Sequence, residues 1–180
     1  KIIAVADKKD AFSENESATL VLFDELKNYE AVGIKTDTQE YSQPKSIKEF
    51  IDLKVKNPTA LLVNGSTDVG LMVTKQRKLL ESIIDISKIY ELKSIEENET
   101  DITYGAGLDL ETLRVHSEEI FPALFDMLTV FGSRQIRLMG TLGGNVANAS
   151  PIGDLPPVLM AYQASIKLVG KDGFRTLPIL

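Results

Sequence analysis

The segment that decides the fold of this chain is Gly140–Pro157, with the sequence GTLGGNVANASPIGDLPP. It combines glycine, asparagine and proline with small apolar residues, and its only charged residue is Asp154. Ordinary surface loops are more polar, whereas a glycine-rich chain lets backbone N–H groups close on a buried ligand. We therefore predict an irregular loop that binds a ligand.

A second glycine-rich loop lies upstream, at Asn64–Gly70, directly after an apolar run. Residues Thr59–Val63 are predicted to form a buried strand, which puts this loop at the carboxyl end of that strand. In open α/β sheets this edge is where ligands bind. The two loops together predict one extended, anionic ligand held between them, although the first loop taken alone is equally well explained as a tight turn.

Neither loop has the signature of a common nucleotide site. A P-loop requires a lysine after its second glycine, and Asn64–Gly70 contains none. The dinucleotide-binding pattern Gly-x-Gly-x-x-Gly is absent as well. The remaining donors are backbone N–H groups and hydroxyls of Gly65–Thr67 and Thr141–Asn145, which could bind a diphosphate without a fixed counter-charge.

The composition excludes several classes of protein. A chain of 180 residues with 43% hydrophobic content predicts one soluble domain, with room for two lobes. The net charge of -6 argues against nucleic acid or an anionic membrane as a partner. No apolar run could span a membrane and no signal-peptide pattern is present, so we expect a cytoplasmic protein. The lack of cysteine and the single His116 leave no iron–sulfur, thiolate or imidazole-rich metal site in the chain.

Residues 1–41 are predicted to be a connector with one amphipathic helix, because a capping box at Ser13–Glu16 precedes apolar residues at helical spacing. Residues 42–90 are predicted to form a small α/β lobe. Residues 91–180 are predicted to form a second lobe of antiparallel strands and helices, which we expect to be truncated at its end. The expected helices begin near Ser46, Leu71, Asp109, Pro122 and Val158, and the further strands are 82–87, 91–96, 101–105, 165–169 and 174–177.

The two loops, in this order and at this separation, resemble the FAD-binding domains of molybdenum hydroxylases. The residues that carry the resemblance are Leu62–Gly70, Gly140–Asn145 and Ala149–Asp154. The resemblance covers residues 42–180 and is strongest to the small iron–sulfur and flavin subunits of bacterial xanthine dehydrogenases. It implies an α+β fold of two lobes, of the flavin-binding type shared with vanillyl-alcohol oxidases.

The resemblance also implies which residues contact FAD. In the family both glycine loops hold the diphosphate, an aromatic residue packs against the isoalloxazine ring, and a polar residue contacts the cofactor. Phe131 and Asp154 match the last two, whereas Asn64 stands where many relatives have a small residue or glycine. The implied FAD-binding residues are Leu62, Val63, Asn64, Gly65, Ser66, Thr67, Asp68, Val69, Phe131, Thr141, Leu142, Gly143, Gly144, Asn145 and Asp154.

The implied function is that of an electron-transfer flavin domain in an oxidoreductase of purine metabolism. Electrons would pass from iron–sulfur centres through FAD to NAD, so no catalytic acid–base pair is expected in this chain. The iron–sulfur clusters and the molybdopterin are expected on partner domains or subunits, and the chain alone is not expected to act on purines. Two alternatives stay open: a self-contained flavin oxidoreductase of the same fold, and a nucleotide-binding or docking module without redox function.

Several of these residues also have simpler explanations. From its spacing alone, Phe131 lies on an apolar helix face and is expected in the core. Asp154 precedes a helical pattern as a helix cap would. We expect His116, Arg134 and Arg137 on the solvated surface, although the two arginines could instead face a flavin or the phosphates of a nicotinamide substrate.

Overall fold

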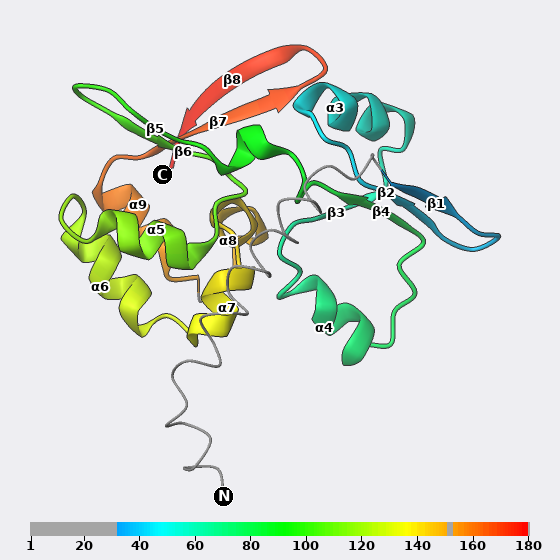
Figure 1. The fold of residues 1–180 in the computed structure, drawn as a ribbon, viewed down its shortest axis with the longest axis horizontal. Coiled ribbons are helices and arrows are strands. Elements are labelled where there is room, and N and C mark those ends of the chain that lie inside the picture. Colours follow the sequence, from blue (N-terminus) through cyan, green and yellow to red (C-terminus); the bar gives the residue numbers. More distant parts are fainter. Residues whose placement is uncertain (1–31, 151–152, 180) are drawn as a thin grey trace, which may run out of the picture. The chain divides into compact units, whose positions relative to one another are not determined.

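The structure of the chain is a computed structural model, and it describes residues 32–150 and 153–179 (Figure 1). These residues belong to one compact unit, Val32–Leu180. The amphipathic helix predicted within residues 1–41 lies outside the described residues. Of the helices that the structure describes, none is both long and apolar enough to cross a membrane.

A four-stranded sheet comes first in the described chain, in the order β1-β2-β4-β3. Its strands are β1 (Gly33–Lys35), β2 (Glu40–Ser42), β3 (Leu61–Val63) and β4 (Ser82–Asp85). β2 and β3 both pair with β4 in parallel, whereas β1 pairs with β2 antiparallel. The carboxyl ends of β3 and β4 therefore lie at the same edge of the sheet.

Two of these strands, β1 and β2, are not predicted from the sequence, and a third, β3, is less buried than expected. β1 and most of β2 lie in the predicted connector, and each has only 3 residues, too few for an alternating pattern to be recognised. The strand predicted at Thr59–Val63 is confirmed as β3, over Leu61–Val63, but it is not buried along its length. β3 is the edge strand of the sheet, and Leu62 is 40% exposed.

Helix α3 (Ile47–Lys56) begins as the capping-box pattern predicts. The Ser46 Oγ atom accepts a hydrogen bond from the Glu49 N–H at 3.2 Å. The Glu49 carboxylate in turn accepts from the Lys45 N–H at 2.8 Å, one residue earlier than in a standard capping box. One N–H group of the first turn and one just before the helix are thus satisfied, and Asn57 caps the end of α3.

Helices and two antiparallel strand pairs make up the rest of the described chain. A 3-10 helix, η1 (Tyr90–Lys93), leads into the first pair, and a two-residue turn joins the strands of the second. Both pairs confirm the predicted hairpins, although η1 replaces the start of the strand predicted at 91–96. The strands are β5 (Ile95–Glu97), β6 (Ile102–Tyr104), β7 (Ser165–Gly170) and β8 (Gly173–Pro178), and the helices are α4 (Val69–Thr74), α5 (Leu110–Ser117), α6 (Pro122–Val130), α7 (Arg134–Met139), α8 (Leu142–Asn148) and α9 (Leu155–Ala161).

The hydrophobic core of this part lies among α5, α6 and α9. α6 contacts both α5 and α9, as Figure 1 also shows. Pro122 begins α6 as predicted, because its missing N–H costs nothing in the first turn of a helix. The buried residues of the core are Leu108, Leu110, Leu113, Leu124, Leu128 and Leu155.

The segment Gly140–Pro157 is not the irregular loop that the sequence predicts, because it contains α8 and the start of α9. Thr141 begins α8: its Oγ1 atom accepts a hydrogen bond from the Gly144 N–H at 3.2 Å. Ala149 ends the helix in the left-handed conformation, with φ of 44°. A threonine cap and a left-handed end can define even a short, glycine-rich helix.

The glycines of α8 serve close packing. A Cβ atom at Gly143 would lie 2.7 Å from the Cβ of Ala106, so no side chain fits there. The Gly143 N–H also donates to the Ala106 carbonyl oxygen at 2.7 Å. This contact fixes the first turn of α8 against the chain between β6 and α5.

Candidate functional site

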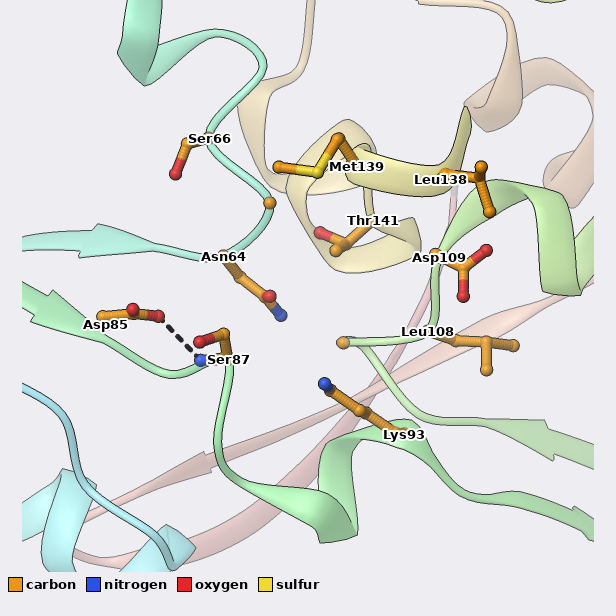
Figure 2. Close-up of a pocket in the computed structure, with 12 residues that line it drawn as sticks. Asn64, Ser66, Asp85, Ser87, Lys93, Leu108, Asp109, Leu138, Met139 and Thr141 are labelled. Atoms are coloured by element: carbon orange, nitrogen blue, oxygen red, sulfur yellow. Dashed lines mark hydrogen bonds between the residues drawn. The ribbon is translucent and has the colours of Figure 1, made fainter. Parts of the chain in front are cut away.

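A cavity of about 380 Å³ lies at the carboxyl ends of β3 and β4 (Figure 2). The loop after β3 forms one side of it, and the segment between α7 and α8 forms another. Part of η1 and the turn before α5 complete its wall. Of the predicted FAD-binding residues, Asn64, Gly65, Ser66 and Thr141 line this cavity.

The loop after β3 has an unusual backbone. Gly65 and Ser66 both have positive φ, 75° and 65°, a conformation that is costly for residues other than glycine. A Cβ atom at Gly65 would lie 1.8 Å from the Met139 carbonyl oxygen and 3.3 Å from the Thr141 side chain. Gly65 is therefore required both by its conformation and by the close approach of the chain after α7.

This loop has backbone donors that the protein does not use. Within the described residues, the N–H groups of Gly65, Ser66 and Thr67 donate to no protein acceptor. Successive free N–H groups in such a conformation form a concave site for an anion. The loop after β3 therefore offers neutral donors of the kind that a diphosphate would need.

The backbone donors of α8 are already in use. The N–H groups of Leu142, Gly143 and Asn145 donate to protein carbonyl oxygens, and that of Gly144 donates to Thr141 Oγ1. The structure therefore favours the first loop as the source of free backbone donors. Contacts from α8 to a ligand would instead involve side chains.

One side-chain atom of α8 lacks a partner. The Oδ1 atom of Asn145 is buried and accepts no hydrogen bond within the described residues. A buried acceptor without a donor costs free energy unless a ligand supplies one. At the other end of α8, Asn148 donates to the Asp68 carboxylate, which connects the helix to the first loop.

A hydrogen-bonded carboxylate lies at the end of β4, beside the cavity. The Oδ2 atom of Asp85 accepts from the Tyr41 hydroxyl at 2.7 Å and from Gln43 Nε2 at 2.9 Å. Its Oδ1 atom accepts from the Ser87 N–H at 2.9 Å. Burial alone would raise the pKa of Asp85, but the hydrogen bonds from Tyr41, Ser87 and Gln43 lower it below its usual value. The sequence analysis missed this group, although an aspartate that ends an apolar strand is a usable signal.

A second carboxylate, Glu111, fixes the turn between α6 and α7. It accepts from the guanidinium groups of Arg114, at 2.9 Å, and Arg137, at 2.6 Å. These hydrogen bonds lower the pKa of Glu111 to about 2. Arg137 also donates to the carbonyl oxygens of Phe131 and Gly132, each at 3.0 Å. Glu111 thus holds the turn that carries Phe131.

The expectation of two solvated arginines is half right. The Arg134 side chain is 74% exposed and lies at the limit of an ion pair with Glu111, at 3.8 Å. The Arg137 side chain is only 11% exposed, so the prediction for this residue is wrong. The physical reason is the ion pair with Glu111, a residue distant in sequence. Its negative charge offsets the cost of removing the guanidinium group from water.

His116 is also not a solvated residue, contrary to prediction. Its Nδ1 atom lies 2.9 Å from the Tyr104 hydroxyl, and its Nε2 atom lies 2.7 Å from the Glu97 carboxylate. The three side chains form a hydrogen-bonded chain between α5 and the β5–β6 pair. Among the described residues, no group of histidine and acidic side chains could hold a metal ion.

The other predicted site residues lie outside the cavity lining. Phe131 is partly buried and packs against the leucine core, as its spacing predicts. Asp154 is exposed at the start of α9, and its side chain makes no capping hydrogen bond. The remaining residues lie in β3 (Leu62, Val63), in the first loop (Thr67, Asp68), at the start of α4 (Val69) and in α8 (Leu142, Gly143, Gly144, Asn145).

Comparison with known proteins shows one family. Residues 35–180 match the family described as FAD binding domain in molybdopterin dehydrogenase. Xanthine dehydrogenase/oxidase of Gallus gallus is 36% identical over 162 residues, which cover 84% of this chain and 12% of that protein. Aldehyde oxidase 2 of Macaca fascicularis is 32% identical over 147 residues, which cover 76% of this chain and 11% of that protein.

Solved structures are similar to the same part of the chain. A carbon monoxide dehydrogenase from Hydrogenophaga pseudoflava, described as lacking the Mo-pyranopterin moiety of its molybdenum cofactor, is 29% identical with a TM-score of 0.75. Quinoline 2-oxidoreductase from Pseudomonas putida 86, at 20% identity, shares the fold with a TM-score of 0.73. Each match covers 81% of this chain and 52% of the solved chain. The mixed α+β fold predicted from the sequence is confirmed by these neighbours.

Proposed function

Because this chain belongs to the family of FAD-binding domains in molybdopterin dehydrogenases, we propose that it binds FAD at the cavity beside β3 and β4. We further propose that it serves as the electron-transfer domain of a molybdenum hydroxylase similar to xanthine dehydrogenase. The bound flavin would supply the redox chemistry, accepting electrons from iron–sulfur centres and passing them as a pair to NAD. The residues of this chain bind and orient the cofactor.

The observation that carries the proposal is the loop Asn64–Asp68. Its free N–H groups at Gly65, Ser66 and Thr67 lie at the carboxyl end of β3, beside the chain that precedes α8. Such donors suit a diphosphate, because they stabilise negative charge without a proton transfer. Two polar groups of the second glycine-rich segment could also contact the cofactor. They are the Thr141 side chain and the unpartnered Oδ1 atom of Asn145.

Two further roles come from the resemblance. Phe131 is proposed to pack against the isoalloxazine ring, and its turn is held by Arg137. Asp154 is proposed to contact the cofactor, which agrees with a side chain that makes no capping hydrogen bond at the start of α9. Residues 42–180 are proposed as the cofactor-binding domain, with lobes at 42–90 and 91–180.

The partners are proposed from the relatives. The chain spans 12% of the first curated relative and 52% of the solved chains that it matches. We propose that an iron–sulfur domain and a molybdopterin-binding subunit complete the enzyme, and that NAD accepts the electrons. We also propose that the enzyme acts in the cytoplasm.

The first experiment compares Gly65→Ala with Gly170→Ala. Both changes add one methyl group, but only Gly65 has positive φ and a close backbone neighbour, whereas nothing lies within 4 Å of the added Cβ at Gly170. The chain and both variants are incubated with FAD, freed of excess cofactor and examined by visible absorption. We expect the wild-type chain and Gly170→Ala to retain a flavin spectrum, and Gly65→Ala to lose most of it.

The outcomes separate the possible functions. A wild-type chain that stays colourless with FAD would contradict the proposed function and favour a docking module. Bleaching of the bound flavin by NADH without oxygen would support NAD as the electron acceptor. Turnover of a small substrate by this chain alone would favour a self-contained flavin oxidoreductase.

A further inference from the structure

The cavity contains more negative than positive charge. Its charged lining residues are the carboxylates of Asp85 and Asp109 and the ammonium group of Lys93. The Asp109 carboxylate accepts from the Thr112 N–H at 2.8 Å and from the Thr112 hydroxyl at 2.7 Å. Hydrogen bonds from neighbouring protein groups thus fix both carboxylates in place. The two carboxylates would repel an anionic ligand unless a positive charge lies nearby.

Lys93 has no carboxylate partner. Within the described residues its ammonium group makes no ion pair, and it lies over the ring of Tyr90, 5.9 Å from the ring centre. Figure 2 shows the side chain directed into the cavity. Lys93 is the only lysine or arginine among the described residues that line it.

The backbone that carries Lys93 is fixed on both sides of this residue. The Leu92 carbonyl oxygen accepts from the Gly107 N–H at 2.6 Å, and the Ser94 carbonyl oxygen accepts from the Gly105 N–H at 2.8 Å. A Cβ atom at Gly107 would lie 2.9 Å from Asn64 Nδ2, so the first loop is close by as well. The backbone at Lys93 is therefore held in place by the protein itself.

We propose that Lys93 pairs with the diphosphate of FAD and supplies the counter-charge that neither glycine loop contains. This inference rests on the proposed function, because it takes FAD as the ligand. The free N–H groups of Gly65, Ser66 and Thr67 are neutral dipoles, so they cannot offset the two carboxylates of the cavity by themselves. A lysine acts on a phosphate as a point charge and needs no fixed geometry.

The test compares Lys93→Met with Lys171→Met, a matched loss of charge in the turn between β7 and β8. The dissociation constant for FAD is measured by quenching of flavin fluorescence at low and at high salt. Because Lys93 is exposed, we expect Lys93→Met to weaken FAD binding about fivefold at low salt. The difference should shrink at high salt, because salt screens the interaction. Lys171→Met should bind FAD like the wild-type chain, and Lys93→Arg should restore most of the affinity.

Riboflavin, which has the same ring system but no phosphate, serves as the second probe. An effect of Lys93→Met on FAD but not on riboflavin supports the proposal. Equal FAD affinities of Lys93→Met and Lys171→Met overturn it while leaving the proposed function intact. A loss that Lys93→Arg does not restore, or that is equally large for riboflavin, also overturns it, because it indicates damage to η1. A wild-type chain that binds no FAD overturns the proposed function itself.

Discussion

At the scale of single residues, Glu111 is the side chain that holds the turn between α6 and α7, where Phe131 lies. It accepts hydrogen bonds from Arg114 and Arg137, and Arg137 also donates to the carbonyl oxygens of Phe131 and Gly132. One carboxylate therefore connects α5 to the turn that carries the proposed flavin contact. Loss of its charge would leave two guanidinium groups without their partner.

We expect Glu111→Gln to lower the midpoint of thermal unfolding by several degrees at neutral pH. The amide keeps the shape of the side chain but removes the charge that both arginines need. Circular dichroism during heating measures the midpoint, with Glu119→Gln, an exposed glutamate, as the control. Equal midpoints for the two variants would show that the ion pairs of Glu111 do not stabilise the fold.

This contact could not be predicted from the sequence. Arg137 and Glu111 are separated by 26 positions, and nothing in the local pattern of either residue indicates the other. The same holds for His116 in α5, whose partners Tyr104 and Glu97 belong to β6 and β5. Local patterns predict the helix start at Asp109, because the capping hydrogen bond joins residues only 3 positions apart.

At the scale of elements, α5 and α9 share an aspartate at the N-cap position, but only one of these side chains caps its helix. Each has an aspartate at the position before its first residue, Asp109 and Asp154. The Asp109 side chain accepts from the Thr112 N–H at 2.8 Å, whereas the Asp154 side chain makes no capping hydrogen bond. The Asp154 side chain therefore does not cap α9, which is consistent with the proposal that it contacts FAD.

We expect Asp109→Ala to lower the free energy of unfolding by about 1 kcal/mol, the usual contribution of a capping side chain. Asp154→Ala should change it much less, because no hydrogen bond is lost. Urea unfolding of both variants measures the difference. Titration with FAD should show the opposite ranking of the two variants. Asp154→Ala should bind FAD more weakly than the wild-type chain, because the proposed contact is lost. A stability loss at Asp154 equal to that at Asp109 would contradict this division of roles.

The elements that the sequence analysis missed are short and depend on tertiary contacts. α7 has 6 residues and α8 has 7, too few for helical periodicity to be recognised. α8 forms because Thr141 caps it and Gly143 packs against Ala106. Helix propensities count glycine as a helix breaker, so they do not predict this helix.

At the scale of the whole molecule, the sequence predicted the association of the two glycine-rich segments better than their conformations. Gly65 lies against Met139 and Thr141, and Asn148 donates to Asp68, so the two segments do come together. The order and separation of the two segments can be compared with a family. The helical conformation of the second segment depends on its packing against Ala106, which the sequence does not reveal. Asp85 and Lys93 join the cavity from elements that the sequence analysis did not connect with it.

Acid should destabilise the folded chain in a defined range. Hydrogen bonds lower the pKa of Glu111 from 4.5 to about 2, and they also lower the pKa of Asp85. Between the unfolded and folded values the unfolded chain binds more protons, so the stabilisation is complete above about pH 4.5 and is lost as pH falls toward 2. Urea unfolding at a series of pH values should show this loss, and Glu111→Gln should show a smaller one. An acid dependence that this variant leaves unchanged would exclude Glu111 as its source.

Alkali should limit stability at the other end of the pH scale, through tyrosines. Burial and the nearby Asp85 carboxylate raise the pKa of Tyr41 from 10.0 to about 12, and burial and the charge of Glu97 raise that of Tyr104 equally. Both folded-state hydroxyls hold their protons more tightly than those of the unfolded chain. Their contribution is therefore complete below pH 10 and is lost as pH rises through 12. Tyr41→Phe removes the hydrogen bond to Asp85, so it should lower stability at neutral pH yet reduce the further loss between pH 10 and 12. An alkaline loss as large in Tyr41→Phe as in the wild-type chain would show that ionisation of Tyr41 does not set this limit.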